Sequence, residues 1–264
     1  MNRILFTCLG FFLTLCLTAT ALAEEGLVAY YSFDNDAEGT IVYDMSGNSL
    51  NGTPQGVTYS TAGISGKCIR SDETYIDIPN HSLLNDLQQL TIEAWINTES
   101  VDSLGGYVIQ KQHYSGGNGG SYAFEVWPDK TIRAVTTKPN GGYEYFSETI
   151  INFSEWVYIV VVVTADTVSI YINGVNAGTG IIPGNLDYQN EPGKNLTIGG
   201  FKANYGYYLG YHGLIDEVKI YNYARTVSQI QESMLNVGKS IDVTDNIIIT
   251  ETGLIAHYNF NEDT

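Results

Sequence analysis

The sequence has few cysteines, and this shortage excludes a disulfide-stabilised fold. Three cysteines occur in 264 residues, and two of them, Cys8 and Cys16, lie in an apolar N-terminal run. A mature chain that starts after this run keeps only Cys68, so it forms no intradomain disulfide. The neighbours of Cys68 indicate a strand, which predicts a buried and inert thiol. The fold must therefore be stabilised by its core or by a metal.

Basic side chains are also scarce. The chain has 12 Lys and Arg against 29 Asp and Glu, a formal net charge of −17, and loss of Arg3 with the N-terminal segment would make it −18. A surface of this charge repels nucleic-acid phosphates and anionic lipids. We therefore expect no nucleic-acid partner. Cations and neutral ligands fit the charge, and simple solubility explains it equally well.

The N-terminal segment has the pattern of a secretory signal peptide. Arg3 precedes an apolar run over residues 4–17, and the small residues Ala21 and Ala23 suit a signal peptidase. The run is too short to span a bilayer comfortably. We expect residues 1–23 to be removed and the mature protein to be secreted, extracellular, at the cell surface or periplasmic, without membrane insertion.

A short internal repeat predicts the domain boundaries. The segment 26–36, GLVAYYSFDND, returns over 253–263 as GLIAHYNFNED, a match too long to arise by chance. This predicts one domain over residues 24–237, a polar linker over 238–252 and the truncated start of a second copy over 253–264. The natural protein is then expected to contain further tandem domains.

Between the two copies, the hydrophobic pattern has the period of strands. About a dozen short runs are separated by turn residues such as Asn173-Gly174, which suit a type I′ hairpin. The run 157–163 is apolar throughout and predicts a strand buried on both faces. One helix is expected, where Thr226 and Gln229 form a capping box, and we place it at the sandwich edge. The predicted fold class is all-β, a two-sheet antiparallel jelly-roll sandwich with one short C-terminal helix.

An ordered series of motifs resembles the laminin G-like domains of the concanavalin A-like lectin/glucanase superfamily. The series consists of the segment 26–34, DMSGNSLNGT (44–53), YIDIP (75–79), LTIEAWI (90–96), SIYING (169–174), LTIGG (196–200) and GLIDEVKIY (213–221). Each motif alone is weak, but their order matches over nearly the whole unit. The resemblance implies two curved antiparallel sheets, a first strand near the last, glycan or protein binding and frequently a bound calcium. Some relatives are enzymes.

The sequence lacks the catalytic carboxylates of those enzymes. Retaining β-glucanases of the superfamily carry Glu-x-Asp-x-Glu on one strand, which directs all three carboxylates to one face, and no such triplet occurs. Glu93 has no carboxylate at alternate positions, so we expect it to be a structural edge residue. Glu125 and Asp129 are separated by a turn at Pro128. With no serine-nucleophile elbow either, we expect a module without catalytic activity.

The resemblance also implies ligands for a structural calcium. Asp216 on the last strand would be the main side-chain ligand, joined by Asp34 and by loop oxygens near Asn51 or Asp72. Calcium takes six to eight oxygen ligands, and Asp216, an acid inside an apolar strand, needs a partner. For Asp34 a solvated acidic loop is an equal alternative, because Asn261 replaces it in the second copy.

Aromatic side chains mark a candidate ligand site on the concave sheet and its rim loops. Sugars stack on exposed rings while their hydroxyls bond to polar neighbours. The predicted contact residues are Tyr114, Trp127, Arg133, Tyr205, Tyr207, Tyr208 and His212. Tyrosine also fills strands, so packing is the alternative for those on the sheet. The sequence therefore predicts a module that binds a polysaccharide or glycoconjugate, or a protein; a structural repeat that displays other domains is the alternative.

Overall fold

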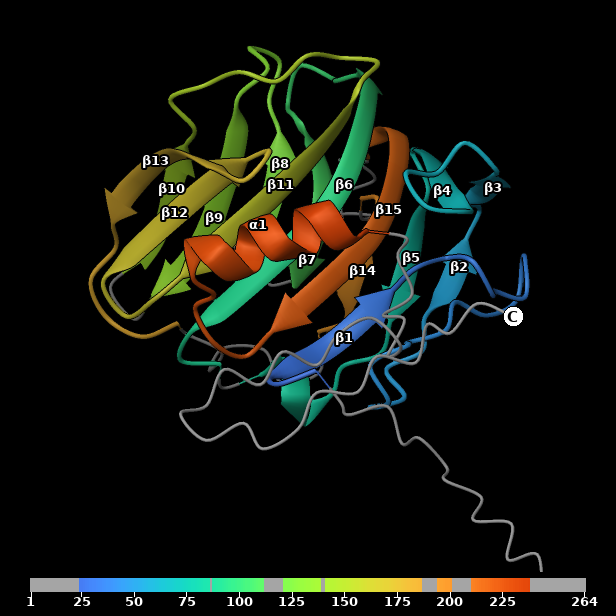
Figure 1. Cartoon of the computed structure of the whole chain (residues 1–264), viewed down its shortest axis with the longest axis horizontal. Helices are drawn as coiled ribbons and strands as arrows, with labels where there is room; N and C mark the ends of the chain where they lie inside the picture. The colour runs from blue at the N-terminus through green and yellow to red at the C-terminus, as the bar shows by residue number, and fades with distance from the viewer. Residues whose placement is uncertain are drawn as a thin grey trace, which may run out of the picture.

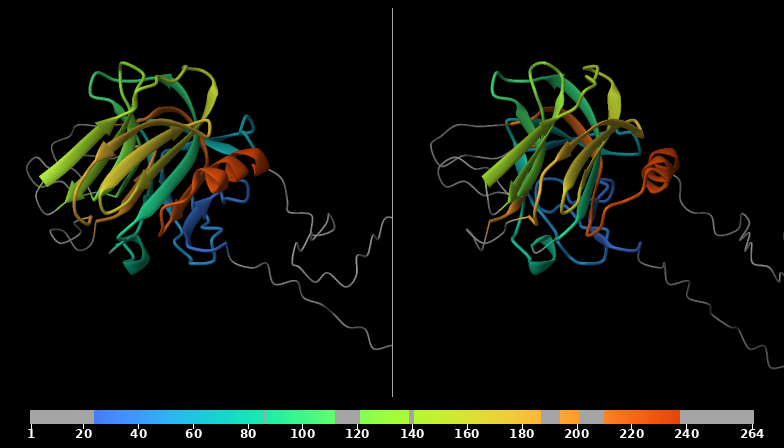
Figure 2. Two further views of the ribbon diagram at one scale, coloured as in Figure 1. Left: turned by 60° about the vertical axis from the view of Figure 1, so that its left-hand side comes forward. Right: turned by 90° about the vertical axis from the view of Figure 1, so that its left-hand side faces the viewer.

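Two antiparallel sheets pack face to face in the computed structural model, which describes residues 24–85, 87–111, 121–138, 141–186, 194–200 and 210–237. One helix lies against the outside of one sheet (Figures 1 and 2). The predicted all-β sandwich with one short C-terminal helix is confirmed. The predicted signal peptide, linker and second copy lie outside the described residues.

The first sheet contains both the first and the last strand. Its order is β13 (Val175–Ile181), β12 (Thr167–Ile172), β11 (Trp156–Val163), β6 (Leu90–Ser100), β15 (His212–Tyr221), β4 (Cys68–Asp72) and β3 (Thr58–Ser60). The first strand, β1 (Leu27–Tyr31), pairs antiparallel with β15. The first and last strands are therefore neighbours, as the family resemblance implied.

The second sheet lies behind the first in Figure 1. Its order is β10 (Gly141–Phe146), β9 (Ile132–Lys138), β8 (Tyr122–Val126), β7 (Gly106–Lys111), β14 (Leu196–Ile198), β5 (Tyr75–Ile78) and β2 (Thr53–Gln55). A single 3-10 turn, η1 (Ser82–Leu84), follows β5. Neither β2 nor β3 was expected, because three residues are too few to show an alternating pattern.

The strand β11 is buried on both faces, as its apolar run predicts. Ile159 and Val161 belong to the core between the sheets, whereas Tyr158 and Val160 pack with Ile230 of α1 (Val227–Asn236). The helix therefore lies across the outer face of the first sheet, and the expected placement at the sandwich edge was wrong. The hairpin after β12 has the expected turn, since Asn173 and Gly174 both have positive φ.

Glu93 is not the edge residue that the sequence suggested. It lies on β6, which has β11 on one side and β15 on the other, and it is 1% exposed. Arg225 places Nη1 2.5 Å from Oε1 of Glu93 and its Cζ 4.3 Å from the ring centre of Tyr221. Burial raises the pKa of Glu93, and the charge of Arg225 opposes this shift. Glu93 and Arg225 thus form a buried ion pair between the first sheet and the segment leading into α1.

Cys68 is a buried thiol, as predicted. It is the first residue of β4, and its side chain is inaccessible to solvent. Burial raises the pKa of the thiol to about 11. Since the thiolate is the reactive form of cysteine, Cys68 has a packing role.

The capping box predicted for α1 is present and can be tested. Thr226 accepts the N–H of Gln229 through its hydroxyl at 3.3 Å, and the side-chain oxygen of Gln229 accepts the N–H of Thr226 at 2.9 Å. Thr226→Ala removes the hydroxyl, so we expect the free energy of unfolding to fall by about 1 kcal/mol in urea denaturation. Thr226→Ser keeps the hydroxyl and should lose little; an equal loss in both variants would contradict the capping role.

Candidate functional site

Two rows of side chains cross the outer face of the second sheet, because directly paired residues of antiparallel strands point to the same side. The first row consists of Tyr107, Glu125, Arg133 and Phe146, across β7 to β10. The second row consists of Thr53, Asp77, Thr197, Gln110, Ala123, Val135 and Glu144. Since α1 packs on the other sheet, this face carries no described helix.

Arg133 is the centre of the first row. Its Cζ lies 4.8 Å from the ring centre of Trp127 and 5.9 Å from that of Phe146, and these two rings meet edge to face at 5.4 Å. Phe146 is 37% exposed and Trp127 is half-buried. Such cation–π contacts hold a guanidinium in a fixed orientation. We call Trp127, Arg133 and Phe146 the aromatic platform.

Two carboxylates flank the guanidinium of the platform. Glu125 is fully buried and forms an ion pair with Arg133, whereas Glu144 is exposed and lies 3.4 Å from Nη2 of Arg133 through Oε1. Burial raises the pKa of Glu125 to about 7, although the charge of Arg133 and the indole N–H of Trp127 oppose the shift. Arg133 is thus held by two acids, one beneath it and one at the surface.

Two polar atoms in the second row are buried without a hydrogen-bond partner among the described residues. They are Oε1 of Gln110 and Oγ1 of Thr197, which are paired in register across β7 and β14. A buried polar atom without a partner is destabilising unless water or a ligand bonds to it. Because both atoms are buried, a ligand beside the platform can bond to them only if the surface above them opens.

Gln110 could not have been placed on this face from sequence alternation. A bulge between Tyr107 and Ile109 interrupts β7, and both Val108 and Ile109 belong to the core. The extra residue shifts the alternation by one position, so Gln110 shares the outer face with Tyr107. Lys111 instead contacts the side-chain oxygen of Asn80 at the end of the strand.

The structure brings together only part of the predicted ligand set. Trp127 and Arg133 lie side by side, and Phe146, Glu125 and Gln110 join them unpredicted. His212 lies on the first sheet, in contact with Asp72 and Asp102, so it does not belong to the platform. The remaining predicted residues, Tyr114, Tyr205, Tyr207 and Tyr208, lie outside the described residues.

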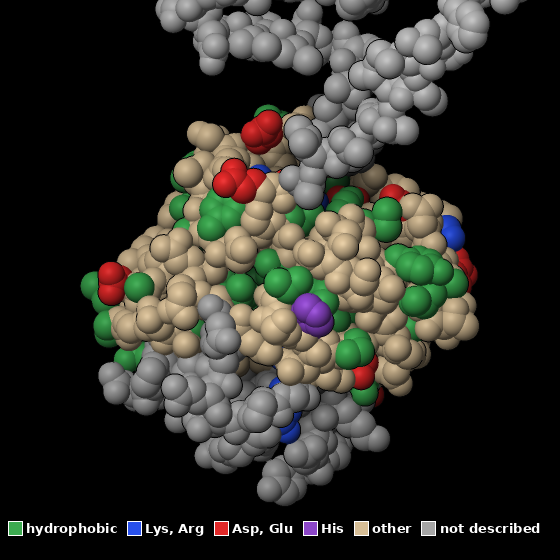
Figure 3. Space-filling model, turned by 90° about the horizontal axis from the view of Figure 1, so that it is seen from below, with side chains coloured by type: hydrophobic (Ala, Val, Ile, Leu, Met, Phe, Trp, Pro, Cys, Tyr) green, Lys and Arg blue, Asp and Glu red, His purple; other side chains and the backbone are tan. Residues whose placement is uncertain are grey.

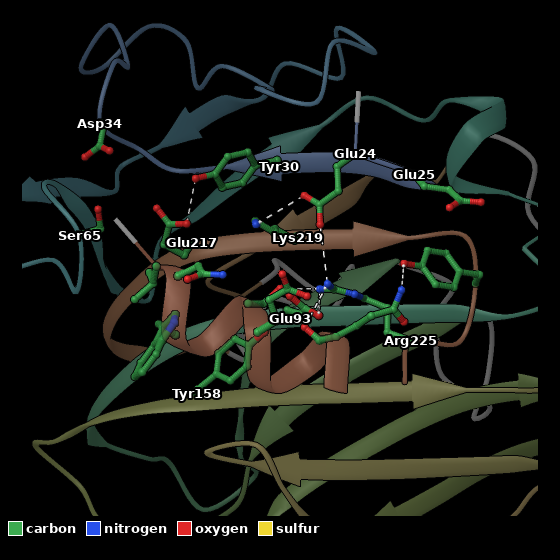
Figure 4. Close-up of a pocket in the computed structure, with 17 residues that line it drawn as sticks. Glu24, Glu25, Tyr30, Asp34, Ser65, Glu93, Tyr158, Glu217, Lys219 and Arg225 are labelled. Atoms are coloured by element: carbon green, nitrogen blue, oxygen red, sulfur yellow. Dashed lines mark hydrogen bonds and ion pairs between the residues drawn. The ribbon is translucent and has the colours of Figure 1, made fainter. Parts of the chain in front are cut away.

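A second candidate site lies where the chain leaves β1 and meets β15. The carboxylate of Asp34 accepts the backbone N–H of Lys67 at 2.7 Å, and that of Asp216 accepts the N–H of Ser65 at 3.2 Å. Glu217 accepts the hydroxyl of Tyr30 at 2.9 Å. Asp34, Ser65 and Glu217 line one end of a cleft of about 650 Å³, as Figure 4 shows. One loop, residues 63–67, therefore links the two predicted acids.

The electrostatics of this site favour a cation. Asp216 is fully buried; burial raises its pKa to about 8, and the charges of Glu217 and Asp34 add to the increase. Phe33 and Glu217 both adopt left-handed backbone conformations, with φ of 61° and 52°, which non-glycine residues seldom do without a compensating contact. Three carboxylates beside a loop of peptide groups are the oxygen donors that calcium takes. The residues thus supply the donor chemistry of calcium, but one oxygen from each of the three carboxylates does not come within 4.8 Å of the other two, so a shared ion would have to draw them together.

Asn51 and Asp72 make other contacts. The amide oxygen of Asn51 accepts the N–H of Asp44 at 2.9 Å within its own loop. Asp72 is paired with His212, four residues from Asp216 along β15, a separation of about 13 Å at the rise of a strand. Glu217, which the sequence did not single out, takes their place beside Asp34 and Asp216.

The end of the sandwich seen in Figure 3 shows scattered charged side chains, and its Lys and Arg do not gather into a basic patch. Among the described helices, none is long and apolar enough to cross a membrane.

Several solved structures share this fold. The binding domain of a paraclostridial mosquitocidal protein has 16% identity and a TM-score of 0.61, with 79% of this chain and 52% of that chain covered. Domain 4 of AbnA, a GH43 extracellular arabinanase from Geobacillus stearothermophilus, has 24% identity and a TM-score of 0.59, with 78% and 97% covered. A Trypanosoma rangeli sialidase has 14% identity and a TM-score of 0.63, with 81% and 33% covered.

At these identities the likeness shows the fold alone. The chain spans about half the length of the mosquitocidal protein's binding domain and a third of that of the sialidase. No curated protein matches the sequence. The family model Laminin_G_3, described as "Concanavalin A-like lectin/glucanases superfamily", matches residues 70–231. With its two-sheet sandwich and more than half of its length matched, the chain belongs to this superfamily.

Proposed function

We propose that this chain is a secreted, non-catalytic module that binds a glycan on the outer face of its second sheet and holds a structural calcium ion. The aromatic platform is the observation that carries the proposal. Trp127 and Phe146 present ring surface beside the fixed guanidinium of Arg133. Rings that stack on sugar C–H faces, together with a few oriented polar groups, are what glycan recognition requires.

Three further observations support a neutral glycan as the ligand. Gln110 and Thr197 have unpartnered polar atoms beneath the same face, which a ligand can reach only if the surface above them opens. Domain 4 of the arabinanase, which shares the fold, is in complex with arabinotriose. The positive charge of Arg133 is already balanced by Glu125, and the acidic chain disfavours anionic polymers.

The signal-peptide pattern of residues 1–23 supports secretion.

The arrangement of acids supports binding without catalysis. A glycosidase needs two carboxyl groups that reach opposite sides of one glycosidic bond. On the described outer face, Glu125 and Glu144 instead both contact Arg133, which stands between them. Glu125 is also fully buried, so a substrate cannot reach it without displacing the guanidinium.

The calcium part of the proposal assigns Asp34, Asp216 and Glu217 as ligands. A bound cation would balance the three charges and join the turn after β1, the loop 63–67 and β15. Gly63 permits the loop 63–67 to approach Asp216 closely, since a Cβ at residue 63 would lie 2.7 Å from Oδ2 of Asp216.

Glycan binding is tested with Trp127→Ala. After a glycan array has identified a ligand, titration calorimetry should show about thirtyfold weaker binding by the variant, because truncation of a central Trp costs about 2 kcal/mol. Tyr43→Ala removes an exposed ring of the loop that precedes β2, at the opposite edge of the sheet from β10, and should bind normally. Equal affinities of Trp127→Ala and wild type would show that the aromatic platform is not the glycan-binding site. An array on which no glycan binds would overturn the proposal of glycan binding.

A further inference from the structure

The start of β15 carries a histidine surrounded by carboxylates from separate segments. His212 is paired in register with Asp72, the last residue of β4. Its Nδ1 lies 2.7 Å from Oδ1 of Asp72, and its Nε2 lies 3.3 Å from Oδ2 of Asp102, in the connection between β6 and β7. Glu73 follows β4, and one ligand atom each from Glu73, Asp102 and His212 lie within 4.8 Å of one another.

The short contact assigns the tautomer of His212. At 2.7 Å, Asp72 accepts the Nδ1 proton in a charge-assisted hydrogen bond. In the neutral ring, Nε2 then carries a lone pair, and it faces a carboxylate oxygen of Asp102 that also has only lone pairs to offer. Two acceptors 3.3 Å apart repel each other unless a cation stands between them. The geometry therefore needs either a proton on Nε2 or a metal ion.

The separation between His212 and Asp102 suits a metal ion. Zinc binds His nitrogen and carboxylate oxygen at about 2.0–2.2 Å in a tetrahedron, whose edges are then about 3.3–3.5 Å. The 3.3 Å separation between Nε2 of His212 and Oδ2 of Asp102 matches such an edge. A metal-bound histidine commonly donates its other N–H to a carboxylate, which is the contact that Asp72 makes.

We propose that Glu73, Asp102 and His212 bind a divalent first-row transition ion, with Zn²⁺ as the best fit, and that Asp72 orients the imidazole. Imidazole with carboxylates suits zinc, whereas calcium takes oxygen ligands alone. The side chains of Glu73 and Asp102 are exposed, so water reaches the remaining coordination position. The ion would join the turn after β4, the β6–β7 connection and the start of β15. This site is separate from the calcium ligands and does not depend on glycan binding.

A proton is the competing cation at this position. Burial of the ring by itself would lower the pKa of His212, but the hydrogen bonds to Asp72 and Asp102 outweigh burial and raise the pKa above its usual value. A protonated His212 would satisfy both aspartates without any metal. Direct measurement of zinc binding distinguishes a protonated His212 from a bound metal ion.

The test is calorimetric titration of tag-free protein with ZnCl₂, after removal of metals by a chelator and saturation with calcium. Wild type should bind one Zn²⁺. Asp102→Asn and His212→Gln should each weaken binding by at least about tenfold, and Asp72→Ala by about 10–100-fold through loss of imidazole orientation. His81→Asn is the matched control: it removes a histidine beyond the far end of β5 and keeps a side-chain acceptor for the N–H of Leu83.

Two results would overturn the zinc site. The first is the absence of zinc binding by wild type, which would leave the proton as the cation. The second is equal zinc affinity of wild type, Asp102→Asn and His212→Gln. Asp102→Asn replaces an exposed side chain with one of the same shape, so the variant is expected to fold, and thermal melting of the same samples checks this. Glycan titration of these samples reports separately on the aromatic platform.

Discussion

Arg225→Ala is expected to lower the free energy of unfolding by about 3–5 kcal/mol, because it leaves the charge of Glu93 buried and unpaired. Glu93 is 1% exposed, and Arg225 is 6% exposed. The guanidinium also donates to Oγ of Ser233 at 2.7 Å and to the carbonyl of Gln229 at 3.1 Å. The substitution therefore also removes two hydrogen bonds by which Arg225, paired with Glu93 of β6, holds α1. Urea denaturation followed by tryptophan fluorescence measures the loss.

An exposed ion pair provides the control for this prediction. Arg70 and Glu99 are 2.6 Å apart, and both side chains are exposed, so Arg70→Ala should cost at most about 1 kcal/mol. The double variant Glu93→Leu with Arg225→Met replaces the buried charges by apolar groups of similar size and should recover much of the stability. If Arg225→Ala costs no more than Arg70→Ala, the buried pair does not hold α1 in place.

The features that the sequence predicted well are local or belong to long strands. The capping box of Thr226 and Gln229 and the Asn173-Gly174 turn depend on residues within one turn of each other, so tertiary packing does not decide them. The position of α1 depends on the contact between Glu93 and Arg225, which are 132 residues apart. No local sequence pattern predicts a contact between residues so far apart. The helix was therefore expected at the edge of the sandwich.

The candidate sites were predictable only where a single residue type was informative. Trp127 and Arg133 could be selected by their chemistry. Phe146 could not, because β10 ends at Phe146 and the register that places it opposite Arg133 depends on a sheet pairing. Glu217 follows Asp216 directly, and strict alternation would place the two on opposite faces. A bulge between Asp216 and Lys219 changes this alternation.

Removal of calcium is expected to lower the melting temperature, and Asp216→Asn should abolish this effect. An ion present at a thousand times its Kd adds about 4 kcal/mol of stability, which corresponds to about 8–16 °C in a domain of this size. Without the ion, Asp216, Glu217 and Asp34 repel one another. Calorimetric melting with chelator, and again after calcium is restored, measures the shift. The variant without calcium should melt at or above the temperature of metal-free wild type, because the amide removes the cost of burying the Asp216 carboxyl beside Glu217 and Asp34.

A chelator also removes transition ions. Only the part of the fall in melting temperature that added calcium reverses is therefore assigned to an ion at Asp34, Asp216 and Glu217. Asp166→Asn, an exposed acid in the turn between β11 and β12, should keep the full calcium response. If wild type melts at the same temperature with and without calcium, the calcium part of the proposed function is wrong. The aromatic platform would stand unaffected, since Trp127 and Arg133 lie on the other sheet and contact none of these acids. Full retention of the calcium response by Asp216→Asn would instead place the ion elsewhere in the chain.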